Sequence, residues 1–371
     1  MLTVKHYTLA STGIHGSILD LSGRNIQTNF MEFQGFIRKV LNHETLSLVE
    51  MTQAMRMIMT GEASPAQIGG FLVGLRMRGE TVDEISAAAS VMRELSTRVE
   101  LAPDYLVDTC GTGGDASGTF NISTASAYVV AAAGARVAKH GNRSVSSKSG
   151  SADVLEAAGV NLNLSPEQVK RCIDEVGVGF LFAQLHHSAM KYAIGPRRDL
   201  GARTIFNLLG PLTNPAAAPN QVLGVFDKQW VRPMAEVLQS LGSRHVMVVH
   251  AQDGLDELSI ASPSYVAELK NGVVTEYTLS PESVGLNSSS LDSIRVPDAA
   301  QSFALIQRVL GGEAGTARDI VCLNAGAAIY VAGLAESHAA GVAKAQAALD
   351  SGQAAQKLQA LIDLTQQFKS P

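Results

Sequence analysis

The sequence predicts an α/β protein in which a small helical domain precedes a larger domain built on a mostly parallel sheet. Before residue 103, apolar side chains recur at helical spacing and Ser or Thr residues stand at cap positions. After Pro103, short apolar runs alternate with helical segments, which is typical of parallel strands flanked by helices. A length of 371 residues also exceeds the usual size of one compact domain, so two domains are expected.

The predicted helical segments begin at Glu44. The second and third are opened by capping boxes at Ser64–Gln67 and Thr81–Glu84, the former with Pro at the first helical position. Residues 1–30 lack such periodicity, and we interpret them as an extension or as the result of a start codon placed too early. The three apolar faces comprise Leu48, Met51, Met55 and Ile58, then Ile68, Leu72 and Leu75, then Ile85, Ala88, Met92 and Leu95.

The predicted sheet contains the apolar runs 105–107, 137–140, 177–182, 221–226 and 245–250. A helix capped by Ser123 or Thr124 should follow the first run, and Ser165–Gln168 should open another. Asn271-Gly272 separates two alternating runs and predicts a hairpin. The Ala-rich region from Asp319 predicts two or three final helices.

Glycines follow the first predicted strand at Gly111, Gly113 and Gly114. Glycine accepts positive φ and lets the backbone approach a ligand closely. Successive backbone N–H groups in such a loop bind anions, and the start of the following helix adds donors. A simple turn explains this segment equally well when it is taken alone.

Hydrogen-bond donors are dense after the second predicted strand. Open α/β sheets bind ligands at the carboxyl ends of their strands. With the glycine loop, these donors therefore indicate a site for a phosphorylated, multiply anionic sugar, although a solvated basic loop is the alternative. They are Lys139, His140, Asn142, Arg143, Ser144, Ser146, Ser147 and Lys148.

Carboxylates follow the predicted strand 245–250, at Asp253, Asp256 and Glu257. Magnesium takes oxygen ligands and usually meets a protein through one or two carboxylates together with substrate phosphates. Alone, Asp256 and Glu257 fit a surface turn. Beside a phosphate-binding loop they favour a magnesium site.

Composition excludes several classes of function. A net charge of -5 argues against a nucleic-acid binder, while the cationic residues concentrate at 139–148 and 191–203. Three scattered cysteines are too few for a disulfide framework or a zinc site and are expected to be reduced. No apolar run approaches the roughly 18 residues of a membrane span, and no secretion signal is present, so a cytoplasmic enzyme is expected.

The chain resembles the anthranilate phosphoribosyltransferases of tryptophan synthesis from about Glu44 to near the C-terminus. The segment from Arg203 to Pro215 is the most specific carrier, because the pyrimidine nucleoside phosphorylases share the phosphate elements and the 149–156 motif but should lack it. Ser188 stands where the family often has Pro, and Ala183-Gln184 stands where Ala-Pro is common. The other carriers are Gly111–Asp115, Asn121–Thr124, Lys139–Arg143, His187–Lys191 and Asp256-Glu257.

The resemblance implies a fold like that of the class II nucleoside phosphorylases. Residues 31–102 would form the helical domain, joined by about 188–218, and residues 103–187 and 219–371 would form the α/β domain. The ligand cleft would lie between the domains. A homodimer formed through the helical domain is also implied.

The implied reaction transfers the 5-phosphoribosyl group from phosphoribosyl pyrophosphate to the amine of anthranilate. No residue is expected to act as a covalent nucleophile. Mg²⁺ would be held by Ser123, Asp256 and Glu257. Anthranilate would contact Gly111, Asn142, His187 and Arg197, with Arg198 or Arg203 ion-paired at the domain junction as an alternative. The sugar donor would contact Gly111, Gly113, Gly114, Asp115, Thr119, Asn121, Ser123, Thr124, Lys139, His140, Gly141, Asn142, Arg143, Ser144, Ser146, Ser147 and Ser151.

Two other classes of function remain open at this point. A nucleoside phosphorylase would use inorganic phosphate and a pyrimidine nucleoside. A regulatory or nucleic-acid-binding relative would keep the fold without the reaction, but the presence of Lys139, Arg197, Asp256 and Glu257 argues against it.

Overall fold

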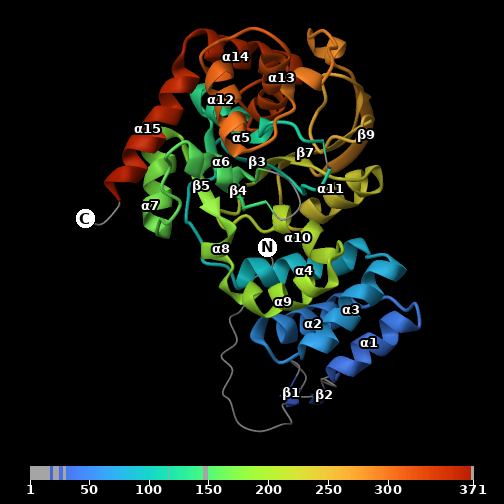
Figure 1. Ribbon diagram of the computed structural model, residues 1–371. Helices are drawn as coiled ribbons and strands as arrows, with labels where there is room; N and C mark the ends of the chain where they lie inside the picture. The colour runs from blue at the N-terminus through green and yellow to red at the C-terminus, as the bar shows by residue number, and fades with distance from the viewer. Residues whose placement is uncertain (1–16, 20–24, 28–30, 116, 145–148, 369–371) are drawn as a thin grey trace.

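The structure, a computed structural model, describes residues 17–19, 25–27, 31–115, 117–144 and 149–368. A seven-stranded sheet lies between helical layers, and a bundle of helices extends from one of them (Figure 1). The predicted fold class is therefore confirmed. Among the described helices, none is long and apolar enough to cross a membrane.

The main sheet has the strand order β5-β4-β3-β6-β7-β8-β9. Strands β3 to β7 pair in parallel, and β8 and β9 add an antiparallel hairpin at one edge. The strands are β3 (Leu106–Gly111), β4 (Arg136–Gly141), β5 (Val178–Phe182), β6 (Asn220–Gly224), β7 (His245–Ala251), β8 (Ser264–Lys270) and β9 (Val273–Leu279). A separate antiparallel pair, β1 (Ser17–Leu19) and β2 (Asn25–Gln27), lies in the segment for which no periodicity was found.

The strand predictions are confirmed with shifted bounds. The first strand was predicted to start at Tyr105, but Tyr105 lies outside it with a positive φ of 53°, and the strand continues to Gly111. The predicted hairpin is present, since Lys270 pairs with Val273 and the two turn residues have φ values of 53° and 75°. Such left-handed values suit Asn-Gly in a two-residue turn.

The helical bundle consists of α1 (Phe33–Leu41), α2 (Leu48–Thr60), α3 (Pro65–Arg78) and α4 (Val82–Glu94). Both predicted capping boxes are present, and a third joins Ser47 to Glu50 at the start of α2. Helix α1 precedes the predicted start at Glu44. Its buried Phe33, Phe36 and Val40 have helical spacing, which is the signal that could have revealed it.

After β5 the chain returns to the bundle through α8 (Ala183–His186), η2 (Ser188–Met190), α9 (Lys191–Leu200) and α10 (Ile205–Leu212). Helix α9 packs on α2 and α3, and α10 packs on α3 and α4 (Figure 1). Helices α9 and α10, which follow β5 in sequence, therefore pack together with the N-terminal helices.

The remaining helices cover the sheet. Three helices follow from Thr316, in agreement with the prediction for the Ala-rich region, whereas α12 was not predicted. The predicted cap of α5 is wrong, because the N-cap residue is Asn121 and its side chain makes no capping hydrogen bond. These helices are α5 (Ile122–Ala132), α6 (Ser151–Ala157), α7 (Pro166–Arg171), η1 (Cys172–Val176), η3 (Lys228–Trp230), α11 (Val231–Ser240), η4 (Pro281–Val284), η5 (Asp292–Ile294), α12 (Ala299–Leu310), α13 (Thr316–Val331), α14 (His338–Asp350) and α15 (Gln353–Gln367).

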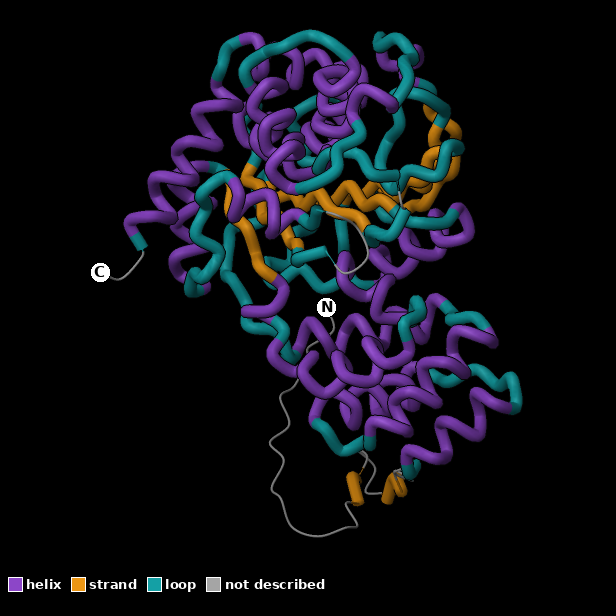
Figure 2. Tube along the Cα trace, viewed as in Figure 1, coloured by secondary structure: helices purple, strands orange, loops and turns teal. Residues whose placement is uncertain are grey.

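Helices lie on both sides of the sheet (Figure 2). Each face of the sheet carries its own buried apolar cluster. Strand side chains alternate between faces, so Met247 and Val249 join the cluster beneath α5 and α13, while Val246 and Val248 join the opposite one. The second cluster continues without interruption into the bundle as far as Phe36. This shared apolar contact fixes the bundle against the sheet.

Candidate active site

The predicted functional segments follow the carboxyl ends of three parallel strands. Strand β3 ends at Gly111, β4 ends at Gly141, and β7 ends at Ala251. Because β3 pairs with β4 on one side and is separated from β7 only by β6, these ends lie along one edge of the sheet. This edge is where ligands bind in open α/β sheets.

The glycine loop contacts Asp256 directly. The Gly113 N–H donates to Asp256 Oδ2 at 2.7 Å, and the Asp256 N–H lies 3.5 Å from Asp115 Oδ2. Gly113 and Gly114 have φ values of 68° and 80°, a conformation that side chains with a Cβ rarely adopt. Segments more than 140 residues apart thus meet at one place.

Glu257 binds the first turn of α5. The Ser123 N–H donates to Glu257 Oε1 at 3.2 Å, so a carboxylate from a distant loop satisfies an unpaired donor of the helix N-terminus. Lys139 Nζ donates to Ser123 Oγ at 3.1 Å and to the Thr109 carbonyl at 2.5 Å. The contacts join β3, β4, α5 and the Glu257 loop.

The acidic groups of this cluster are half-buried close to one another. Burial, with the charges of Asp115 and Glu257, raises the pKa of Asp256 well above its usual value. Burial also raises the pKa of Glu257 to about 7, although Lys139 and hydrogen bonds from Ser123 oppose the rise. The pKa of Lys139 is lowered mainly by its own burial. A further positive charge beside the carboxylates would relieve their repulsion.

The donor set fits a hard divalent cation. Carboxylate and hydroxyl oxygens of Asp256, Glu257 and Ser123 lie in one cluster with Asp115. Among the described residues, no three His, Cys, Asp or Glu side chains form a metal-binding group. The set therefore suits a cation that completes its coordination with water and substrate oxygens, as magnesium does.

Asn121 and Thr124 lie at the start of α5. The Asn121 side chain donates to the Ser149 carbonyl at 3.2 Å and accepts from Ser302 Oγ at 2.8 Å. Ser302 was missed by the sequence analysis because α12, which carries it, was not recognised. The Thr124 hydroxyl is buried and has no hydrogen-bond partner within the described part of the chain.

The loop after β4 is tied to α6. Asp153 Oδ2 accepts from the N–H groups of Ser144 and Gly150, at 3.1 and 2.9 Å. Ser151 Oγ donates to the Asn142 carbonyl at 3.3 Å. A Cβ on Gly141 would lie 2.3 Å from Ser151 Oγ, so glycine is required there. The predicted ligand residues Ser146 and Ser147, with Lys148, lie outside the described residues.

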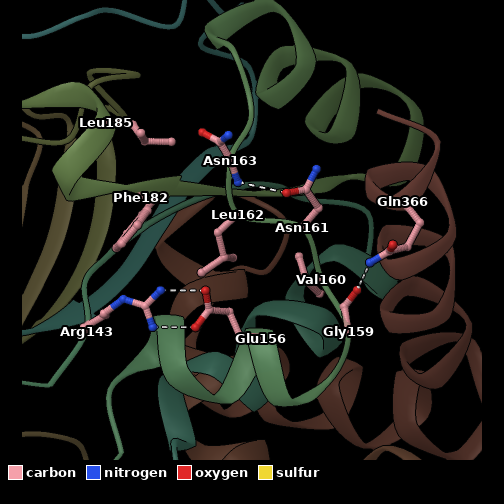
Figure 3. A pocket seen from close by; sticks show the side chains of 10 residues that line it. All are labelled: Arg143, Glu156, Gly159, Val160, Asn161, Leu162, Asn163, Phe182, Leu185 and Gln366. Carbon is pink, nitrogen blue, oxygen red and sulfur yellow. Dashed lines mark hydrogen bonds and ion pairs between the residues drawn. The ribbon is translucent and has the colours of Figure 1, made fainter. Parts of the chain in front are cut away.

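Arg143 binds carboxylates of α6 and not the acidic groups near Ser123. Its guanidinium donates to both carboxylate oxygens of Glu156, lies 3.3 Å from Asp153 and covers the Phe182 ring at 5.6 Å. It lines a pocket of about 520 Å³ that shares no other residue with the predicted ligand-binding set (Figure 3). Arg143 is therefore already engaged by carboxylates of α6.

The loop residues Asp115, Ser117, Gly118 and Thr119 lie beside the cluster. Asp115 Oδ1 accepts from the Ser117 N–H at 3.1 Å, and the Ser117 and Thr119 hydroxyls are 3.2 Å apart. Arg295 holds this loop, since its guanidinium donates to the Ser117 carbonyl at 3.0 Å. Thr119 also forms a β-bridge with Arg295.

His140 and His187 form a buried pair. Their Nε2 atoms are 3.3 Å apart, and the rings are tilted with centroids at 5.2 Å. Burial and the neighbouring imidazole charge hold the pKa of His140 well below its usual value, and burial lowers that of His187 to about 4. Both rings are therefore neutral near pH 7.

Arg197 is a half-buried cation without an anionic partner among the described residues. It lies on α9 with its guanidinium 5.1 Å from the centre of the Phe206 ring. Burial lowers its pKa. The neighbouring Arg198 is exposed and lies 3.7 Å from Asp199.

Arg203 does not form the ion pair that was considered for the domain junction. Within the described residues it instead donates to the Gly114 carbonyl and lies over the Phe226 ring at 4.2 Å. The chain between α9 and α10 is thereby joined to the glycine loop.

Known proteins resemble this chain over most of its length. Models of the glycosyl transferase family match residues 34–96 as its helical bundle domain and residues 103–355 as its a/b domain. The anthranilate phosphoribosyltransferase of Thioalkalivibrio sulfidiphilus is 67% identical over 335 residues, with 90% of this chain and 99% of the relative covered. That of a Marinomonas species is 60% identical over 343 residues, with 92% and 99% covered.

Solved structures show the same fold. The crystal structure of anthranilate phosphoribosyltransferase from Thermus thermophilus has a TM-score of 0.85 at 44% identity and covers 89% of this chain and 99% of its own. The Saccharomyces cerevisiae enzyme in complex with phosphoribosyl pyrophosphate and Mg has a TM-score of 0.83 at 24% identity, covering 91% and 99%. These likenesses extend over both the bundle and the sheet, and the chain belongs to the anthranilate phosphoribosyltransferase family.

Proposed function

We propose that this chain transfers the 5-phosphoribosyl group from phosphoribosyl pyrophosphate to the amine of anthranilate, releasing pyrophosphate. The observation that carries the proposal is the meeting of the glycine loop, the start of α5, Lys139 and two acidic residues at one sheet edge. The high identity to relatives that bear this activity in their name supports it.

The sugar donor would bind along the carboxyl ends of β3 and β4. Breaking the bond from ribose C1 to pyrophosphate moves an electron pair onto the departing oxygen, so the main task is to stabilise negative charge. The Lys139 ammonium and the remaining N–H groups of the 111–114 loop can do this without proton transfer, while the Thr112 and Gly113 N–H groups hold Gly224 and Asp256. Asn121 and Thr124, whose hydroxyl has no partner among the described residues, would hold oxygens of the donor.

Ser123, Asp256 and Glu257 would hold Mg²⁺ in this proposal. The raised pKa of each carboxyl is the expected property of a site built to meet a cation. When bound, magnesium would neutralise charge on the leaving pyrophosphate oxygens. Asp256 and Glu257 would supply oxygen ligands. The contact of Glu257 with the Ser123 N–H aligns its carboxylate with the start of α5.

The acceptor would bind between α9 and the end of β4. The planar guanidinium of Arg197 suits the anthranilate carboxylate, and its lack of an anionic partner among the described residues supports that role. Gly111, Asn142 and the neutral His187 would line the same pocket. An arylamine nitrogen is a competent nucleophile without a strong base, so positioning would supply much of the rate.

An activity assay tests the proposal. Anthranilate fluorescence should fall when the chain is mixed with phosphoribosyl pyrophosphate, and the fall should require Mg²⁺. Release of uracil or thymine from a nucleoside with inorganic phosphate would instead support the phosphorylase alternative. Fluorescence loss that is equally fast in the presence of a chelator would contradict the Mg²⁺ assignment but not the transfer reaction.

Changing Asp256→Asn together with Glu257→Gln should lower turnover strongly, by about 100-fold or more, because Mg²⁺ would lose its charged ligands. The rate would be measured at saturating Mg²⁺, with circular dichroism to verify folding. Asp292→Asn, at an exposed carboxylate, is the control and should leave the rate unchanged. An unaltered rate in the double variant would remove both residues from the metal site.

We also propose a cytoplasmic homodimer with the domain division given by the family resemblance. Exposed apolar side chains of the bundle support a subunit interface there. They include Leu41 on α1, Val49 on α2, and Val73 and Met77 on α3. The three cysteines are free and buried, which is typical of a reducing compartment.

A further inference from the structure

The segment that carries Asp256 and Glu257 is fixed by a side chain from α13. Asn324 is only 3% exposed, and its Oδ1 accepts the Leu258 N–H at 3.0 Å. Its Nδ2 donates to the Leu258 carbonyl and to the Ile320 carbonyl, each at 2.9 Å. One amide group thus binds both backbone polar groups of the residue that follows Glu257.

Strand backbone also confines this segment. A Cβ on Gly224 would lie 1.5 Å from the Asp256 carbonyl oxygen, and a Cβ on Gly111 would lie 2.7 Å from Asp256 Oδ2. Strands β3 and β6 therefore approach the segment as closely as glycine allows. Because Asn324 also binds Leu258, the chain from Asp256 to Leu258 has little freedom to shift.

Helix α13 also supports the second half of the cluster. It packs along α5, whose first turn presents Ser123 to Glu257. Displacement of Leu258 from α13 would therefore move Glu257 relative to Ser123. Groups that orient the ligands of a metal in this way commonly change its affinity by 10- to 100-fold when they are removed.

We infer that Asn324 is a positioning residue that holds Asp256 and Glu257 in register with α5 for binding of Mg²⁺ and the phosphoribosyl donor. The inference rests on the proposed function, because it presumes that these carboxylates meet a cation. Asn324 itself touches backbone rather than substrate. Its effect should therefore appear in metal and donor binding and not in binding of the acceptor.

The test compares Asn324→Ala with Asn220→Ala. Asn220 is a matched control, because it is also a buried amide that donates to a backbone carbonyl, that of Leu106 at 2.9 Å, but it stands at the opposite end of β6. Calorimetric titration would measure binding of phosphoribosyl pyrophosphate over a series of Mg²⁺ concentrations. Steady-state assays would give the KM of each substrate and the half-saturating Mg²⁺ concentration.

Asn324→Ala should raise the half-saturating Mg²⁺ concentration and the donor KM about 10-fold or more, with the anthranilate KM unchanged. Asn220→Ala should lower thermal stability without altering these values. Equal values in Asn324→Ala and wild type would overturn the inference, as would a matching increase in the anthranilate KM. If the wild-type chain shows no dependence on Mg²⁺, the proposed metal site fails instead.

A second variant tests the same segment if Asn324→Ala does not fold. Gly224→Ala should displace the Asp256 carbonyl and weaken Mg²⁺ and donor binding in the same selective way. Gly70→Ala on α3, where an added Cβ meets no atom within 4 Å, is its control. Donor binding by Gly224→Ala that matches wild type would count against the proposed register.

Discussion

At the scale of single residues, the candidate site is marked by charged groups that lack their usual compensation. Arg197 is half-buried and has no carboxylate partner among the described residues, while Asp256 and Glu257 are half-buried neighbours whose like charges raise the pKa of Asp256. Burial of charge is costly unless an opposite charge is present. Groups with this property are candidates for binding charged ligands.

Arg197→Ala should raise the anthranilate KM about 100-fold while the donor KM changes little, because a charge-assisted bidentate contact would be lost. Steady-state kinetics with each substrate varied in turn would measure both values. Arg198→Ala, one residue along and exposed, should behave as wild type. Equal increases in both KM values would remove Arg197 from the acceptor site.

Residue types alone did not reveal the hydrogen-bond partners of Arg143 and Arg203. Arg143 belongs to the donor-rich segment 139–148, yet it is bound by Glu156 and Asp153. Arg203 contacts the Gly114 carbonyl, not an acidic group. A side chain's charge can be read from sequence, but the direction in which it points depends on neighbours distant in the chain.

At the scale of elements, local patterns predicted local structure well. Capping boxes, strand runs and the Asn-Gly turn depend on residues within a few positions of one another, and each was found. The start of α5 is the exception, because Glu257 meets its first turn across 134 residues. A cap contributed by another part of the chain leaves no signal beside the helix.

Glu268 on β8 joins several elements through one carboxylate. It accepts hydrogen bonds from Tyr277 of β9 and Tyr330 of α13, at 2.9 and 2.8 Å, and contacts His245 of β7 at 2.8 Å. Burial raises its pKa, but these three contacts outweigh that effect and the pKa falls to about 2 from the usual 4.5. A depressed pKa stabilises the fold above pH 4.5, and the contribution is lost as pH falls toward 2.

Glu268→Gln should therefore reduce the free energy of unfolding near neutral pH by on the order of 2 kcal/mol. The difference from wild type should shrink between pH 4.5 and pH 2, as the native carboxylate becomes protonated. Urea unfolding at several pH values would measure it. Glu276→Gln, on the exposed side of β9, is the control, and a pH-independent difference for Glu268→Gln would contradict the argument.

At the scale of the whole molecule, the bundle and the sheet share one apolar cluster. Phe36 of the bundle and Val248 of the sheet belong to it, and α9 and α10 pack on the bundle helices. The chain just after α9 also reaches the glycine loop, because Arg203 donates to the Gly114 carbonyl, and this contact supports an acceptor site between the domains.

The proposed dimer interface gives a prediction at this scale. Val73→Lys with Met77→Lys on α3 should weaken self-association about 10-fold or more, because charge would replace exposed apolar side chains, Met77 being 80% exposed. Sedimentation velocity over a range of concentrations would measure it. Val273→Lys on β9, also exposed but remote from the bundle, should not alter association. A wild-type chain that is monomeric throughout would contradict the proposal.

The sequence by itself determined the fold class, the family and most of the elements, because periodicity, caps and motifs act over short stretches of chain. It did not reveal α1, α12 or the pair β1 and β2. Tertiary structure alone decided that Asp256 would meet Gly113, that Glu257 would meet α5, and that Asn324 would hold the segment after them. These contacts join residues that are 66 to 143 positions apart. Such residues come within hydrogen-bonding distance only when the strands pair into the sheet and the helices pack on its faces.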